Sequence, residues 1–228
     1  MPLAQGTVGQ IYAQDGSVPA GGLRQGKLGS LVVHELHGRF YEQVYRGNTY
    51  SIGSNLTALS ANTITLTATT TPIVGLWNPF NSPVNAVILQ AAVGFVLNTL
   101  TTPVAPGPML WTTNIVQTAI TTGLAPFNRK TLQNSGSQVK GFAFTALTGM
   151  SSNLVVLEPA DFPQPSGQTA GTIVASTASS TFAQGFNGVE NFDGNLIVPP
   201  GGVLALINTT STTTYSAAGR LLWEEVPL

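Results

Sequence analysis

The chain has 228 residues and a formal net charge of -1, and charged residues make up 7% of it, against roughly 25% in an average soluble domain. So few basic residues exclude a phosphate-binding patch for nucleic acid, and the absence of Cys excludes disulfides, thiolate metal sites and Cys nucleophiles. The surface is expected to carry hydroxyl and amide groups or to be hidden against other chains, and we favour hidden surface because little electrostatic repulsion opposes self-association.

Residues 5–30 are rich in Gly and Gln and poor in large apolar side chains, so this segment cannot bury enough surface to fold alone. It is either a disordered tail or an arm that becomes ordered on a partner. The N-terminus has neither a basic nor an apolar stretch, so no signal peptide is expected. Composition changes near residues 47–60. We therefore predict an arm with the first strands in residues 1–50 and a β-sandwich domain in residues 51–228.

Strands are expected at residues 30–36 and 39–46, and the second is rich in aromatic side chains. Aromatic residues beside an arm fit a contact between subunits. The two histidines, His34 and His37, lack the spacing that places two metal ligands one helical turn apart, so no metal site is expected. The candidate interaction residues are Phe40, Tyr41, Tyr45, Tyr50 and Trp223.

No charged residue or histidine lies between Arg46 and Arg129. Within this stretch, residues 63–69 alternate between Thr and apolar side chains, as in a strand with one buried face. The longest apolar run, residues 86–97, contains Gln90 and is shorter than the about 20 residues of a membrane-spanning helix. It therefore predicts a core strand, and no association with a membrane is expected.

Short strands separated by Pro, Gly and Asn turns predict an all-β fold, and no segment has a long helical period. Turns are expected at Asn78-Pro79 and Asp193-Gly194, among other places. Further strands are expected at residues 72–77, 84–97, 110–119, 138–145, 154–157, 171–176, 195–198, 203–208 and 217–225.

Two carboxylate pairs, Glu158 with Asp161 and Glu190 with Asp193, have a three-residue spacing and lie next to Pro or Gly. They are interpreted as solvated turn residues. If folding joined the pairs, they could bind Ca²⁺ or act in glycoside hydrolysis. No nucleophile elbow or nucleotide-binding motif occurs, so no catalytic residue and no cofactor are expected.

Two segments near the C-terminus, residues 194–207 (GNLIVPPGGVLALI) and 217–227 (AAGRLLWEEVP), resemble the closing strands of small jelly-roll proteins encoded among the virion genes of tailed bacteriophages. Residues 77–96 resemble them more loosely. On the last strand, one of Glu224 and Glu225 is expected in solvent and the other between subunits. The resemblance implies a jelly-roll-like β-sandwich with an extended N-terminal arm, and a protein that decorates or cements capsids or forms short head fibres, often as a trimer.

These observations together predict a non-enzymatic capsid decoration or cement protein. It would be made in the host cytoplasm and would work on the capsid surface of the virion, as a homo-oligomer, most simply a trimer, bound to the major capsid protein or to other virion proteins. Two alternatives stay open. One is a receptor-binding head or tail fibre protein that recognises host glycans, and the other is a carbohydrate-active enzyme that uses the paired carboxylates.

Overall fold

The structure is a computed structural model that describes residues 40–55, 57–59, 71–97, 107–116, 123–134, 136–145, 147, 153–162, 185–209 and 212–228. The strands expected at residues 30–36, 63–69 and 171–176 lie outside the described residues, as do residues 5–30 and both histidines. The compact unit that holds the described strands spans Glu42–Leu228.

Strands make up nearly all of the described secondary structure, and the one described helix is α1 (Tyr41–Arg46). The all-β fold class predicted from the sequence is therefore confirmed. The strands are β1 (Thr49–Gly53), β2 (Thr57–Leu59), β3 (Val74–Trp77), β4 (Val84–Leu97), β5 (Met109–Ile115), β6 (Phe127–Asn128), β7 (Lys140–Phe142), β8 (Val155–Pro159), β9 (Gly185–Val198), β10 (Gly202–Asn208) and β11 (Thr212–Pro227).

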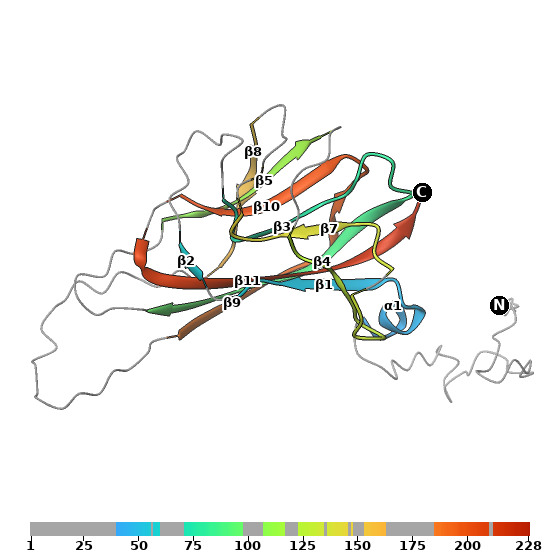
Figure 1. Cartoon of the computed structure of the whole chain (residues 1–228), viewed down its shortest axis with the longest axis horizontal. Helices are drawn as coiled ribbons and strands as arrows, with labels where there is room; N and C mark the ends of the chain where they lie inside the picture. The colour runs from blue at the N-terminus through green and yellow to red at the C-terminus, as the bar shows by residue number, and fades with distance from the viewer. Residues whose placement is uncertain are drawn as a thin grey trace, which may run out of the picture. The chain divides into compact units, whose positions relative to one another are not determined.

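The strands pair in the nested order of a jelly roll. Antiparallel ladders join β1 to β11, β3 to β10, β4 to β9 and β5 to β8. One sheet has the order β6-β1-β11-β4-β9, with β2 also on β11, and the other has the order β7-β3-β10-β5-β8. Figure 1 shows the two sheets as facing layers, with β10 and β3 in one and β11 and β1 in the other. This order of eight strands confirms the jelly-roll-like sandwich.

The core lies between the two sheets and is built by alternating side chains. On β4 the side chains of Ala91, Val93 and Phe95 point inward and are buried, as period-2 geometry requires. Trp111 and Trp223 are fully buried in the same cluster. The apolar run expected as a core strand is thus confirmed as part of β4. No helix in the described part of the chain is long and apolar enough to cross a membrane.

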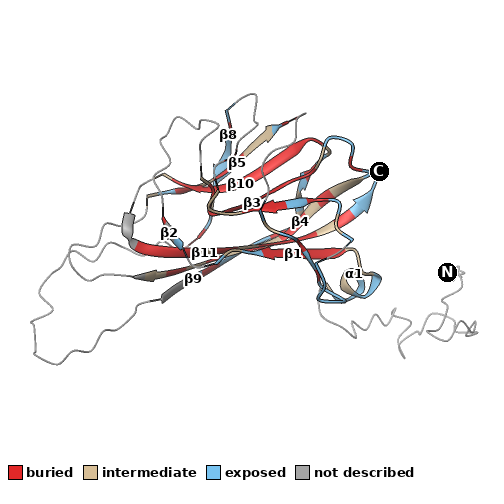
Figure 2. Cartoon of the chain, viewed as in Figure 1, coloured by how far each residue is buried: buried red, intermediate tan, exposed pale blue. Residues whose placement is uncertain are grey.

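Strand β10 is buried on both of its faces, which explains its nearly continuous apolar sequence. Leu204 and Leu206 point into the core between the sheets, whereas Val203, Ala205 and Ile207 belong to a second apolar cluster. In Figure 2 β10 is coloured as buried while β8 is exposed. The second cluster is completed by Trp77, Val116, Phe142, Leu147 and Leu154, so the connection from β5 to β8 contributes to covering the outer face of this sheet.

The prediction of a strand at residues 39–46 is wrong, because the helix α1 occupies most of this segment. Glu42 and Arg46, four residues apart, form an ion pair of 3.1 Å along the helix. The helix ends at Gly47, whose φ of 83° is the left-handed conformation that glycine adopts at helix ends. The aromatic residues favoured a strand, and the i,i+4 charge pair was the signal for a helix.

The turn expected at Asp193-Gly194 is a bend inside β9 rather than the end of a strand. Both residues have left-handed φ values, 55° and 85°, and the ladder with β4 is interrupted between Ile88 and Gln90. β9 pairs with β4 both before and after the bend. The strand therefore begins at Gly185, ten residues before the strand expected at residues 195–198. The interpretation of Glu158 and Glu190 as turn residues is also wrong, because they lie in β8 and β9.

Candidate functional site

The connection between β5 and β8 builds one edge of the sandwich. Its strand β6 pairs with β1 at the end of one sheet, and its strand β7 pairs with β3 at the end of the other. Leu124 and Gly141 exchange backbone hydrogen bonds of 3.0 and 3.3 Å, which join the segment before β6 to β7. We call the edge formed by β6 and β7 the closed edge.

A buried carboxylate holds this connection against the last strand. Glu225 on β11 is 6% exposed and accepts hydrogen bonds from the Ser137 hydroxyl (2.5 Å), the backbone N–H of Gln138 (3.1 Å) and that of Val139 (3.4 Å). The indole N–H of Trp223 points to the same carboxylate at 3.4 Å. A buried charge needs such donors, so Glu225 serves the fold of its own chain.

The expectation of one solvated and one inter-subunit carboxylate on β11 is therefore wrong. Glu225 is enclosed by residues 137–139 of the same chain. Its neighbour Glu224 lies on the opposite face of the strand, where it accepts a hydrogen bond of 2.9 Å from the side-chain amide of Asn48.

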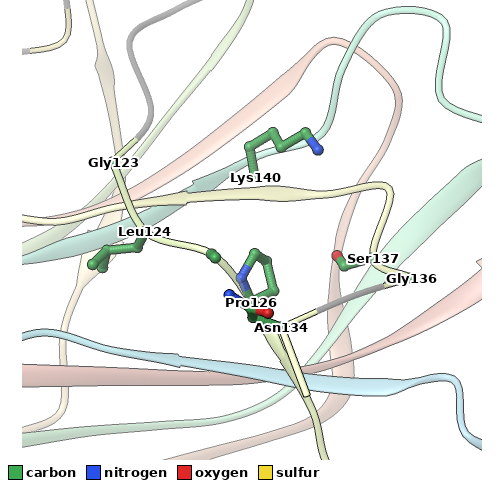
Figure 3. A pocket seen from close by; sticks show the side chains of 8 residues that line it. Gly123, Leu124, Pro126, Asn134, Gly136, Ser137 and Lys140 are labelled. Carbon is green, nitrogen blue, oxygen red and sulfur yellow. The ribbon is translucent and has the colours of Figure 1, made fainter.

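A hollow of about 530 Å³ opens at the closed edge. Leu124 and Pro126 give it an apolar side, and Asn134 and Ser137 add polar groups. Figure 3 shows Lys140 on the other side of the hollow from Pro126 and Asn134. The ammonium group of Lys140 has no ion-pair partner among the described residues. The hollow therefore combines an apolar wall with a lysine ammonium group that forms no ion pair with any described carboxylate.

Basic side chains gather at and beside the closed edge. Arg46 is paired with Glu42, and the Lys130 ammonium lies over the Tyr45 ring, 4.9 Å from its centroid. Arg129, in the turn after β6, has no ion-pair partner among the described residues. Together with Lys140, these positions place four basic side chains at or beside the closed edge, which also holds the carboxylates of Glu42 and the buried Glu225.

The opposite edge is formed by β8 and β9, and we call it the open edge. These strands end the two sheet orders, and within the described part of the chain no further strand pairs with either of them. β8 carries three consecutive exposed apolar residues, Val155 (62% exposed), Val156 (46%) and Leu157 (45%). Natural proteins normally protect such an edge with charge, Pro or a covering segment, because it invites pairing with another chain.

Three carboxylates come together at the open edge. Glu190 on β9 accepts a hydrogen bond of 2.8 Å from the indole N–H of Trp111 and another from the backbone N–H of Asp161. Burial raises the pKa of Glu190, and the charges of Glu158 and Asp161 raise it further, while the two hydrogen bonds act in the opposite direction. The structure thus brings Glu190, which the sequence paired with Asp193, close to Glu158 and Asp161, which form the other predicted pair.

The Glu190→Gln variant is expected to lose less stability than the wild type as the pH rises from below 4.5, the ordinary pKa of this side chain, to neutrality. A carboxyl group with a raised pKa in the folded state contributes stability that is fully present below its unfolded pKa and is lost as the pH rises through its folded pKa. Gln cannot ionise. Urea unfolding at several pH values measures the difference, and the same pH dependence in both proteins would contradict the assignment.

The predicted interaction residues separate into two groups. Tyr41 and Tyr45 on α1 are exposed, and Phe40 is partly buried. Tyr50 and Trp223 are buried in the core, where their rings stack with centroids 6.2 Å apart. Of the five, Tyr41 and Tyr45 are accessible to a second molecule.

The outer face of the six-stranded sheet carries a row of polar side chains across three strands. Arg220 on β11 donates to the Gln90 side chain on β4, which donates to Asn191 on β9 at 2.8 Å. Burial lowers the pKa of Arg220, and the nearby charge of Arg129 acts in the same direction. A shallow hollow of about 420 Å³ beside this row is lined mostly by small residues.

Comparison with protein-family models, with curated protein sequences and with solved structures finds no match to this chain. The described residues contain no group of three His, Cys, Asp or Glu side chains that could hold a metal ion. Reasoning from the sequence did not predict three features of the site: the hollow around Lys140, the exposure of β8 and the burial of Glu225. A signal existed for the last, because Leu221, Trp223 and Glu225 alternate on one face of a strand.

Proposed function

We propose that this chain is a non-enzymatic structural protein of a virion, a self-associating jelly roll that decorates a capsid surface. The observation that carries the proposal is the open edge, where β8 exposes three adjacent apolar side chains and, among the described strands, pairs with β5 alone. A surface of this kind is typical of a contact between chains.

The composition and the fold support the same function. Only 17 of the 228 residues (8 basic and 9 acidic) carry charge, so contact faces can be desolvated without the several kcal/mol that each buried ion costs. Jelly rolls are common among virion and lectin domains. The resemblance of residues 194–207 and 217–227 to closing strands of phage virion proteins favours the virion among these classes.

The proposal predicts that the purified protein is an oligomer, most simply a trimer, and that it is found on the outside of particles. Analytical ultracentrifugation from about micromolar concentration downward measures the first. Gold-labelled antibody on purified particles, viewed by electron microscopy, measures the second. A monomer at all concentrations that is also absent from particles would contradict the proposal.

A second candidate function is supported by the carboxylates of the open edge. A half-buried Glu with a raised pKa beside another carboxylate is the arrangement used by general acids in glycoside hydrolysis. The test is an assay on host polysaccharides with the wild type and with the Glu158→Gln and Glu190→Gln variants. Cleavage by the wild type that both variants lose would favour the enzyme over the structural protein.

A further inference from the structure

We propose that the chain associates head to tail, with the open edge of one molecule docked at the closed edge of a second copy so that β8 faces the hollow around Lys140. This inference rests on the proposed function, in which the protein self-associates, and it names the two surfaces that meet.

The closed edge supplies a receptor for an acidic and apolar segment. Lys140 lines the hollow and has no ion-pair partner among the residues that the structure describes. Leu124 and Pro126 supply the apolar wall. The backbone of β7 is already used at this position, because Gly141 exchanges hydrogen bonds with Leu124. Recognition here must therefore use side chains rather than the addition of a strand.

The open edge supplies the matching segment. Val155, Val156 and Leu157 are exposed, and Glu158 follows them directly on the same strand. Within the described ranges no cation pairs with Glu158, and the like charges of Glu158 and Glu190 act on each other. A cation from outside the molecule would relieve this repulsion while the apolar side chains leave water.

The two surfaces cannot meet within one molecule. Lys140 lies on the first strand of its sheet and Glu158 on the fifth strand of the same sheet. Four strand spacings of about 4.8 Å separate them by roughly 19 Å. Their charges can therefore be paired only between copies.

Charge also favours this arrangement over a symmetric one. If two copies joined through the open edge about a two-fold axis close to Glu158, the carboxylates of Glu158, Asp161 and Glu190 in both copies would lie near one another. Like charges that face each other across an interface oppose association. A head-to-tail contact instead places Glu158 against Lys140, and repeated contacts of this kind can close into a ring.

A charge exchange tests the contact. We expect Lys140→Glu and Glu158→Lys each to weaken self-association about tenfold or more, because each places like charges in the interface. The double variant, with both substitutions in one chain, restores an opposite pair in every contact and is expected to recover association to within about threefold of the wild type. Sedimentation equilibrium measures all four proteins, and far-UV circular dichroism checks that each is folded.

Arg129→Glu is the matched control, since Arg129 is an exposed basic residue at the closed edge that does not line the hollow. It changes net charge as Lys140→Glu does and is expected to leave association nearly unchanged. Single variants that associate like the wild type would overturn the head-to-tail contact while leaving the oligomer and the proposed function intact. Stronger association of Glu158→Lys with no effect of Lys140→Glu would overturn it in favour of a two-fold contact. A monomeric wild type would overturn the head-to-tail contact, and only its additional absence from particles would overturn the proposed function.

Discussion

Replacing Glu225 by Ala is expected to lower the free energy of unfolding by about 3 kcal/mol, because buried donors lose a charged acceptor. The Ser137 hydroxyl and the N–H groups of Gln138 and Val139 all donate to this carboxylate, which is almost inaccessible to water. Urea unfolding at one fixed protein concentration measures the loss, since the stability of an oligomer depends on concentration.

Glu224 provides the matched control for this measurement. It is the adjacent residue of β11, faces the other side of the sheet and accepts one hydrogen bond from Asn48. Glu224→Ala is expected to cost under about 1 kcal/mol. If the two variants lose equal stability, Glu225 does not anchor the connection. Hydrogen exchange at the Gln138 amide should also become faster in Glu225→Ala alone, because its hydrogen bond to the carboxylate is lost, whereas the Val139 N–H keeps the Ser137 hydroxyl oxygen (3.2 Å) as an acceptor.

Replacing Gly75 by Ala is expected to destabilise the sandwich by about 3 kcal/mol through overpacking. A Cβ at Gly75 would lie 2.3 Å from the ring of Phe142 and 2.6 Å from the backbone oxygen of Leu204. Phe142 is fully buried, so its ring has no free space to enter. Thermal and urea unfolding both measure this loss.

Gly53→Ala is the control for the change at Gly75. Gly53 is also in a strand, β1, but a Cβ there meets no atom within 4 Å. This variant is expected to stay within about 0.5 kcal/mol of the wild type. A cost at Gly53 similar to that at Gly75 would point to strand propensity rather than to the contact with Phe142.

Much of the fold was predictable because strands and turns leave local signals. The apolar run of β4 and the residues of β10 between two turns matched the expected strands closely. Short edge strands were missed, since β6 has two residues and its pairing with β1 depends on a partner far away in the sequence. For the helix α1 a strand was predicted instead, because the aromatic residues were given more weight than the charge pair at helical spacing.

The candidate site was less predictable because it is created by pairing across the fold. Glu158 and Glu190 are 32 positions apart and meet because β8 and β9 end different sheets on the same side. The hollow around Lys140 depends on where the connection from β5 to β8 crosses the sandwich. Periodicity can indicate that a side chain such as Glu225 faces inward, but it cannot show which groups donate hydrogen bonds to its carboxylate.

The pairing of β1 with β11 has a consequence for the timing of folding. Asn48 donates a hydrogen bond to Glu224, which is 176 residues further along the chain. β1 pairs with β6 on one side and with β11 on the other. Contacts of such long range slow folding to the range of milliseconds to seconds. β11 is the central strand of this sheet, which can therefore form only after β11 has been synthesised. Until then β1 and β4 lack the strand that lies between them, so the nascent chain cannot complete this sheet while the earlier residues are being synthesised.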